Sequence, residues 1–96
     1  MVLDVSKITG IGAYETKPEK NRTIFLKGDR AFLVLNKNTI EIRCDSQLSA
    51  NLQEKYESVM QSRYFGKGGI EIVLAGQLTD EELADLIRLS YNLTTS

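Results

Sequence analysis

The stretch from Thr23 to Cys44, TIFLKGDRAFLVLNKNTIEIRC, decides the fold of this chain. It contains three runs rich in aliphatic, aromatic and β-branched side chains, at 23–27, 30–35 and 39–44. Gly28-Asp29 separates the first two runs, a composition typical of a two-residue hairpin turn. Asn36-Lys37-Asn38 supplies a second turn before the third run. The stretch therefore predicts three consecutive antiparallel strands.

The side-chain patterns of these runs predict how the sheet is covered. In the run 30–35 all residues after Arg30 are apolar, so both faces of a strand there would be apolar. We therefore expect a central strand that is covered on both faces. In the run 39–44, Ile40, Ile42 and Cys44 alternate with polar side chains. This alternation predicts a half-buried strand with one apolar and one polar face.

Two helices are predicted after these strands. The Asp45 carboxylate can cap a helix that begins at Ser46, and an apolar stripe follows at Leu48, Leu52, Tyr56 and Val59. The sequence Thr79-Asp80-Glu81-Glu82 is a capping box, and Leu83, Leu86, Ile87, Ser90 and Tyr91 after it have helical spacing. A fourth strand is predicted between the helices at 70–74.

The predicted order β-β-β-α-β-α favours an α+β fold, with an antiparallel sheet of about four strands and helices packed on one face. Residues 1–22 show no clear periodicity. Within them, the polar segment 16–21 holds the single proline and predicts an exposed loop. We expect one domain over residues 1–96, because a chain of 96 residues supports a single core.

Composition excludes several kinds of chemistry. The chain has no histidine and one cysteine, Cys44, which excludes an imidazole base, a Cys–His triad, an intrachain disulfide and a Cys/His zinc site. We therefore expect a non-enzymatic protein without metal or cofactor, and a buried, unreactive Cys44. No apolar run approaches the roughly 20 residues of a membrane helix, and Met1–Asp4 does not resemble a secretion signal. A cytoplasmic protein without a membrane partner is expected.

Charge is distributed unevenly along the chain. Residues 1–44 carry eight basic and five acidic side chains, whereas residues 45–96 carry four and eight. The net charge of −1 is thus the sum of +3 in the first half and −4 in the second half. Such halves can lie on different faces of one fold, and a basic face is what a nucleic acid would contact.

Two groups of residues are candidates for such contact. The glycine-rich segment 63–69 combines Arg63 and Lys67 with Tyr64 and Phe65, whose rings could stack on an unpaired base. The second group surrounds the first hairpin and consists of Lys17, Lys20, Arg22, Lys27 and Arg30. For both groups a purely structural interpretation stays open: the glycines and aromatic rings form a tight bend at the core edge, and the basic residues are simply solvated.

Three segments together resemble the MmcQ/YjbR-like family, over about residues 23–93: the run Gly28–Leu35, the strand Ile40–Arg43, and Leu86-Ile87 followed by Ser90-Tyr91. The resemblance implies a CyaY-like fold and DNA binding through a proposed double-wing arrangement, without an established enzymatic activity. The chain departs from the family at 64–70, where only Lys67 matches a His-Met-Asn-Lys-x-His-Trp-like run. It is therefore similar to a short or divergent member.

Two functional hypotheses follow. The first is weak electrostatic binding of DNA by a non-enzymatic protein, through Lys17, Lys20, Arg22, Lys27, Arg30, Arg63, Tyr64 and Lys67. The second is a protein-interaction module that docks an unknown partner on its sheet face or its acidic C-terminal helix. The pI of about 5.4 is low for a domain that binds duplex DNA by itself. The outward Val73 and the apolar run 31–35 allow a dimer contact, and the sequence leaves the oligomeric state open.

Overall fold

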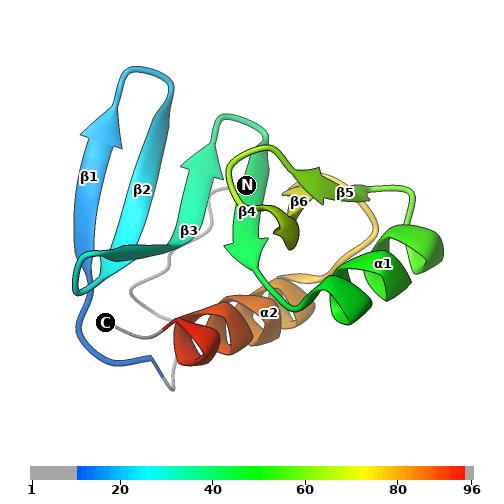
Figure 1. The fold of residues 1–96 in the computed structure, drawn as a ribbon. Helices are drawn as coiled ribbons and strands as arrows, with labels where there is room; N and C mark the ends of the chain where they lie inside the picture. Colours follow the sequence, from blue (N-terminus) through cyan, green and yellow to red (C-terminus); the bar gives the residue numbers. More distant parts are fainter. Residues whose placement is uncertain (1–10, 95–96) are drawn as a thin grey trace.

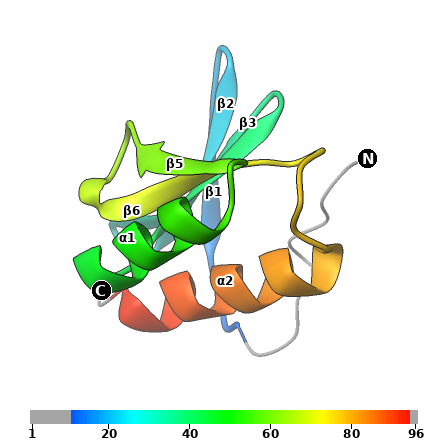
Figure 2. The same cartoon turned by 90° about the vertical axis from the view of Figure 1, so that its right-hand side faces the viewer.

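The computed structural model describes residues 11–94 and contains one six-stranded sheet with two helices on one face (Figures 1 and 2). The elements are β1 (Glu15–Glu19), β2 (Arg22–Lys27), β3 (Arg30–Asn36), β4 (Thr39–Arg43), α1 (Ser46–Lys55), β5 (Val59–Ser62), β6 (Gly66–Val73) and α2 (Asp80–Leu93). The strand order is β1-β2-β3-β4-β6-β5, and all neighbouring strands are antiparallel. The expected α+β class with an antiparallel sheet is confirmed. The expectation about a secretion signal falls on residues 1–10, outside the described residues.

The prediction of about four strands was wrong, because two short edge strands carry no clear apolar pattern. Strand β1 pairs with β2 from Arg22 to Leu26, although all five of its residues are exposed and Pro18 lies within it. An edge strand tolerates proline and polar side chains, since only one of its sides pairs. The segment 16–21, expected as a loop, therefore forms most of β1 and the turn after it.

The second missed strand is β5, at the opposite edge of the sheet. The apolar stripe predicted a helix that continued to Val59, but α1 ends at Lys55. Tyr56 leaves the helix with extended backbone, at φ −125° and ψ 127°, and Val59 is buried in β5. The helical spacing of Val59 was coincidental, because the residue packs into the same core from a strand.

The local signals at turns and helix ends are confirmed. Gly28 adopts the positive φ of 66° that a tight hairpin turn requires. The Asp45 side chain accepts a hydrogen bond of 2.8 Å from the Leu48 amide. At the start of α2, the Glu82 amide donates to the Thr79 hydroxyl at 3.1 Å, and the Thr79 amide donates to the Glu82 carboxylate at 3.0 Å.

The main core lies between the sheet and the two helices. It includes the inward faces predicted for the strands, with Ile40, Ile42, Ile70 and Ile72 fully buried. Ser90 of α2 fastens the helix to the sheet: its hydroxyl donates to the Phe32 carbonyl of β3 and accepts from the Arg43 amide of β4 at 2.8 Å. The Ser90 hydroxyl therefore joins α2 to two neighbouring strands.

The opposite face of the sheet, called the open face below, carries a second and smaller apolar cluster. It consists of Ile24, Ala31 and Val34, with Leu26 and Phe65 packed against it. Val34 is fully buried, which confirms that β3 is covered on both faces. The cover comes in part from the connection between β5 and β6, which folds back over the sheet and places Phe65 on this cluster.

Two glycines let this connection fold back. Gly66 has a φ of +63°, a conformation that side-chain-bearing residues rarely adopt. A Cβ at Gly69 would lie 2.5 Å from the Ile42 carbonyl oxygen and 2.6 Å from the Phe65 Cβ. These positions support the structural interpretation of the glycine-rich segment. Among the described residues, no helix has the length and apolar character needed to cross a membrane.

Candidate nucleic-acid interface

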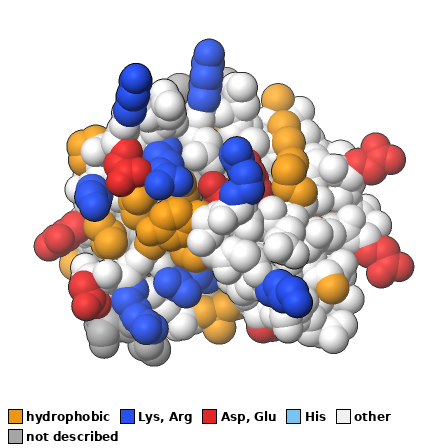
Figure 3. Space-filling model, turned by 45° about the horizontal axis from the view of Figure 1, so that its top comes forward, with side chains coloured by type: hydrophobic (Ala, Val, Ile, Leu, Met, Phe, Trp, Pro, Cys, Tyr) orange, Lys and Arg blue, Asp and Glu red, His pale blue; other side chains and the backbone are white. Residues whose placement is uncertain are grey.

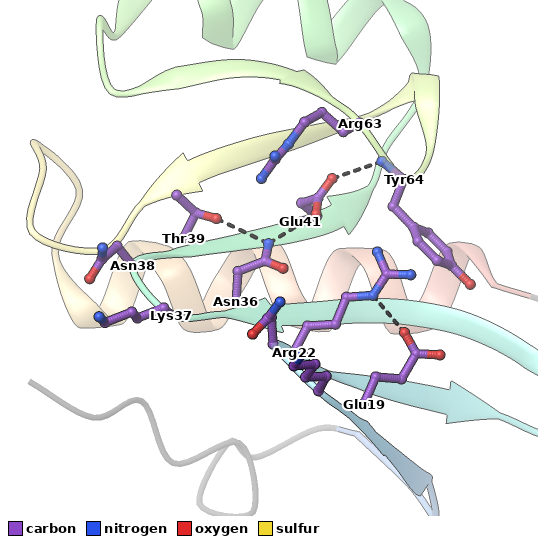
Figure 4. Close-up of a pocket in the computed structure, with 11 residues that line it drawn as sticks. Glu19, Arg22, Asn36, Lys37, Asn38, Thr39, Glu41, Arg63 and Tyr64 are labelled. Carbon is purple, nitrogen blue, oxygen red and sulfur yellow. Dashed lines mark hydrogen bonds and ion pairs between the residues drawn. The ribbon is translucent and has the colours of Figure 1, made fainter.

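A polar cavity of about 780 Å³ lies on the open face, at the end of the sheet where two turns project. Its walls come from the β1–β2 turn, the β3–β4 turn and the connection between β5 and β6. Figure 4 shows Arg63 and Tyr64 on one side, Asn36 and Glu41 at the base, and Arg22 with Glu19 across from them. Three segments distant in sequence thus form one concave surface.

Two buried carboxylates lie at and beside the base of this cavity. Glu41 of β4 and Glu71 of β6 are direct partners in the strand register, and each residue is 2% exposed. The alternation of 39–44 had predicted an exposed polar face, and for Glu41 this was wrong. Like charges directly opposite each other on adjacent strands are unfavourable, so both carboxylates require hydrogen-bond donors.

Glu41 receives three donors. Its Oε1 accepts from the Ser62 hydroxyl and from the Tyr64 amide, both at 2.8 Å, and its Oε2 accepts from the Asn36 side-chain amide at 2.9 Å. Burial, the largest single influence, raises the pKa of Glu41, but the donors and the charge of Arg63 together outweigh burial, and the net pKa is lowered. The ionised carboxylate therefore holds the β5–β6 connection against the sheet.

Glu71 is neutralised by Arg63. The guanidinium donates twice, from Nε at 2.9 Å and from Nη2 at 2.8 Å, and the Thr39 hydroxyl donates to Glu71 Oε2 at 2.8 Å. These bonds to Glu71 raise the pKa of Arg63. The Arg63 side chain is 77% exposed, whereas that of Glu71 is only 3% exposed. Arg63 therefore covers the buried carboxylate and presents its own outer surface to the cavity and to solvent.

The other wall is formed by Arg22 and Tyr64. Arg22 Nε donates to Glu19 Oε1 at 2.7 Å, and the Arg22 guanidinium carbon lies 5.3 Å from the centre of the Tyr64 ring. Tyr64 is 42% exposed and packs edge-on against Phe65, with ring centres 4.9 Å apart. The exposed ion pair contributes little stability, so Arg22 remains free to exchange Glu19 for another anion.

The structure brings some of the predicted residues together and separates others. Lys20, Arg22, Arg63 and Tyr64 line the cavity. Lys17 lies on the same face one strand away, because it is opposite Ile24 in the β1–β2 register. The β2–β3 hairpin is not a free two-stranded wing, since β1 pairs along β2.

Lys27, Arg30 and Lys67 lie elsewhere. Lys27 donates to the Tyr91 carbonyl at 3.0 Å and lies 4.4 Å from the centre of the Tyr91 ring. It thereby places a positive charge at the end of α2, whose last turn has no basic residue. Arg30 begins β3, about 20 Å along the strand from Asn36. Lys67 belongs to the first part of β6 and does not line the cavity.

Sequence reasoning missed seven lining residues of this site: Glu19, Asn21, Asn36, Lys37, Asn38, Thr39 and Glu41. The available signal was the likeness of two turns, since Lys20-Asn21 and Lys37-Asn38 both place a lysine beside an asparagine. The two turns become neighbours only because the strands that carry them pair in register. Recognising β1 as a strand would have been needed to use this signal.

The charge around the cavity favours an anion. Four cations line it: Lys20, Arg22, Lys37 and Arg63. Against them stand the carboxylates of Glu19 and Glu41 and that of Glu71, which is paired with Arg63, so one positive charge is in excess. In Figure 3, which brings the open face forward, Lys and Arg side chains stand around a group of hydrophobic ones. Among residues 11–94, no cluster of three or more acidic or cysteine side chains is arranged to hold a metal ion. The arrangement suits a ligand that has both phosphate groups and a flat apolar part, such as a base.

Comparison with known proteins identifies the fold alone. No protein-family model matches the chain, and no curated protein matches it. The fold is similar to that of a crystal structure of a protein from Pseudomonas syringae, solved by a structural genomics consortium. The TM-score is 0.71 with 20% sequence identity, and the match covers 83% of this chain and 87% of that chain. The chain therefore shares an α+β architecture with that protein.

Proposed function

We propose that this protein is a non-enzymatic nucleic-acid-binding domain that uses the cavity on the open face. The observation that carries the proposal is the convergence of Lys20, Arg22, Lys37 and Arg63, from three separate segments, around one cavity. Basic side chains that neutralise phosphates supply most of the affinity for nucleic acids. An excess of one positive charge predicts weak binding with a shallow salt dependence.

A binding role fits the chemistry of the cavity better than catalysis. The carboxylates of Glu41 and Glu71 are occupied by donors from the protein itself, and the lowered pKa of Glu41 disfavours a role as general acid. Cytoplasmic location and membership in the MmcQ/YjbR-like family, with its CyaY-like fold, remain part of this proposal. Family membership rests on the sequence resemblance given above, whereas the location rests on the short apolar runs and the single cysteine of the sequence.

Fluorescence anisotropy with labelled single-stranded and duplex DNA, across a salt series, tests the proposal. For a single strand, each neutralised phosphate contributes about 0.7 to the slope of log affinity against log salt. With two to four contacts we expect a slope of about −1.5 to −3. Absence of binding at low salt, or affinity that is independent of salt, would contradict the proposal and favour the protein-interaction module.

A pair of matched variants locates the site. Lys20→Ala with Lys37→Ala removes two exposed lysines from the cavity, whereas Arg30→Ala with Lys67→Ala removes two exposed cations outside it. We expect the first double variant to reduce the salt slope by about 1.4 and the second to leave it nearly unchanged. Equal losses in the two double variants would mean that only the overall charge matters and that the cavity is not the site.

A further inference from the structure

We infer that the ligand is single-stranded and that an unpaired base stacks on Tyr64 inside the cavity. This inference rests on the proposed function and deepens it, because it names the form of nucleic acid and the residue that selects that form. The observations that carry it are the concave shape of the site, the exposure of one aromatic residue within it, and the hydrogen bonds that fix the backbone of this residue.

The shape of the site distinguishes a single strand from a duplex. The cavity is open to solvent and has a volume of about 780 Å³, which is room enough for a base. In a duplex the bases are paired and stacked within the helix, so only phosphates and groove edges would reach the charged rim. An unpaired nucleotide can place its base inside the cavity while its phosphates contact Lys20 and Lys37 at the turns.

Tyr64 is the aromatic surface that such a base would contact. Tyr64 is 42% exposed, and it is one of the residues that line the cavity. Phe65 is occupied otherwise, because it packs on the apolar cluster of the open face. Of the two adjacent aromatic residues, the structure therefore leaves Tyr64 for a ligand.

The position of Tyr64 is held before any ligand arrives. The Tyr64 amide donates to Glu41, and the Ser62 hydroxyl donates to the same carboxylate oxygen while it accepts from the Phe65 amide. Ser62 and Tyr64 are thus tied to one buried carboxylate, and the Phe65 amide is tied to Ser62. The backbone that carries the ring is thus fixed, and the ring itself packs against Phe65. It therefore loses little conformational entropy on binding, which favours its use as a stacking surface.

Arg22 adds to this surface. Its guanidinium lies over the Tyr64 ring and is paired with Glu19. If a phosphate replaces Glu19, the guanidinium can donate to it while it stays over the ring. Base and phosphate would then be bound by neighbouring groups on one wall. Because every base has a stacking face, the site is expected to discriminate strand form more than base sequence.

The experiment compares three labelled or competing polyanions. The probes are a thymidine strand of about 12 nucleotides, within the usual site sizes, the same strand in a duplex with its complement, and inorganic polyphosphate, which has no bases. Wild-type protein should bind the single strand more tightly than the duplex. Tyr64→Ala should weaken single-strand binding at least about fivefold and leave polyphosphate binding unchanged, since stacking contributes about 1–3 kcal/mol per base.

Two controls separate stacking from folding and from charge. Tyr64→Phe keeps the ring and should stay within about twofold of wild type for the single strand. Thermal unfolding should be nearly unchanged in Tyr64→Ala, because the backbone bond to Glu41 does not involve the side chain. The Lys20→Ala, Lys37→Ala double variant should weaken all three ligands, because phosphates are common to them.

The outcomes distinguish the inference from the proposed function. If wild-type protein binds none of the three polyanions, the proposed function itself fails. If it binds them with the expected salt dependence but Tyr64→Ala binds the single strand as well as wild type does, the electrostatic site stands and the stacking inference is overturned. An equal loss for polyphosphate in Tyr64→Ala, or a preference for the duplex, also overturns it.

Discussion

The ion pair between Arg63 and Glu71 should respond very differently to removal of either partner. Arg63 is 77% exposed and Glu71 is 3% exposed at the side chain. Removing the guanidinium leaves a buried carboxylate that directly faces Glu41, another carboxylate, in the strand register. Removing the carboxylate leaves a guanidinium that water already solvates. The variant that keeps Glu71 and loses Arg63 should therefore lose more stability than the variant that loses Glu71.

The magnitudes follow from the bonds in the structure. Arg63→Met removes two charge-assisted hydrogen bonds to Glu71. Breaking a fully buried pair costs about 3–5 kcal/mol, and water can enter here once the exposed arginine is gone, so we expect about 2 kcal/mol. For a domain of this size that is a fall in Tm of about 8–16 °C. Glu71→Gln removes the repulsion with Glu41 and should stay within about 1 kcal/mol of wild type.

Urea unfolding followed by circular dichroism at pH 7 measures these differences. The double variant Arg63→Met with Glu71→Gln should be more stable than Arg63→Met alone, because the uncompensated charge is gone. A Glu71→Gln variant that loses as much stability as Arg63→Met would refute the reasoning, and so would a double variant that is less stable than Arg63→Met.

Three further predictions concern the pH dependence, the cysteine and the helix end. The pKa of Glu41 is lowered from its ordinary value of 4.5, so its ionisation stabilises the fold above about that pH, and this stability is lost as the pH falls through the lowered pKa. The unfolding free energy should therefore fall on acidification below about pH 4.5. In urea unfolding between about pH 3 and pH 7, Glu41→Gln should make the unfolding free energy less dependent on pH. A pH profile that is the same in Glu41→Gln and wild type would contradict the role of Glu41. Cys44 is 4% exposed and burial, the main cause, raises its pKa to about 11. Its thiol should react with Ellman's reagent at pH 8 only as the protein unfolds, and rapid reaction of the native protein would show that the site is open. Lys27→Met should lower stability by about 1 kcal/mol, because the charge at the end of α2 and the contact with the Tyr91 ring are lost, while single-strand affinity stays the same. Lys17→Met is the control on the exposed strand β1, and equal destabilisation by both variants would argue against the Lys27 contacts.

The sequence by itself determined the features whose energies are local. The Asp45 cap, the Thr79–Glu82 capping box and the Gly28 turn each depend on hydrogen bonds or backbone angles within about four residues. The apolar faces of β4, β6 and α2 were equally readable, because their spacing follows the period of each element. These signals were sufficient for the α+β class and for the helices on one face.

Only the tertiary structure decided the site. Glu41 and Glu71 had the alternation of exposed strand residues, and they became buried because the β5–β6 connection folds back and supplies Arg63 and the Tyr64 amide. Lys20 and Lys37 lie on different turns that register between strands brings to one cavity. Lys27, close to Lys20 in sequence, was drawn instead to the end of α2. The sequence shows how many charged side chains the protein has, whereas strand pairing and the packing of the helices decide on which face those charges lie.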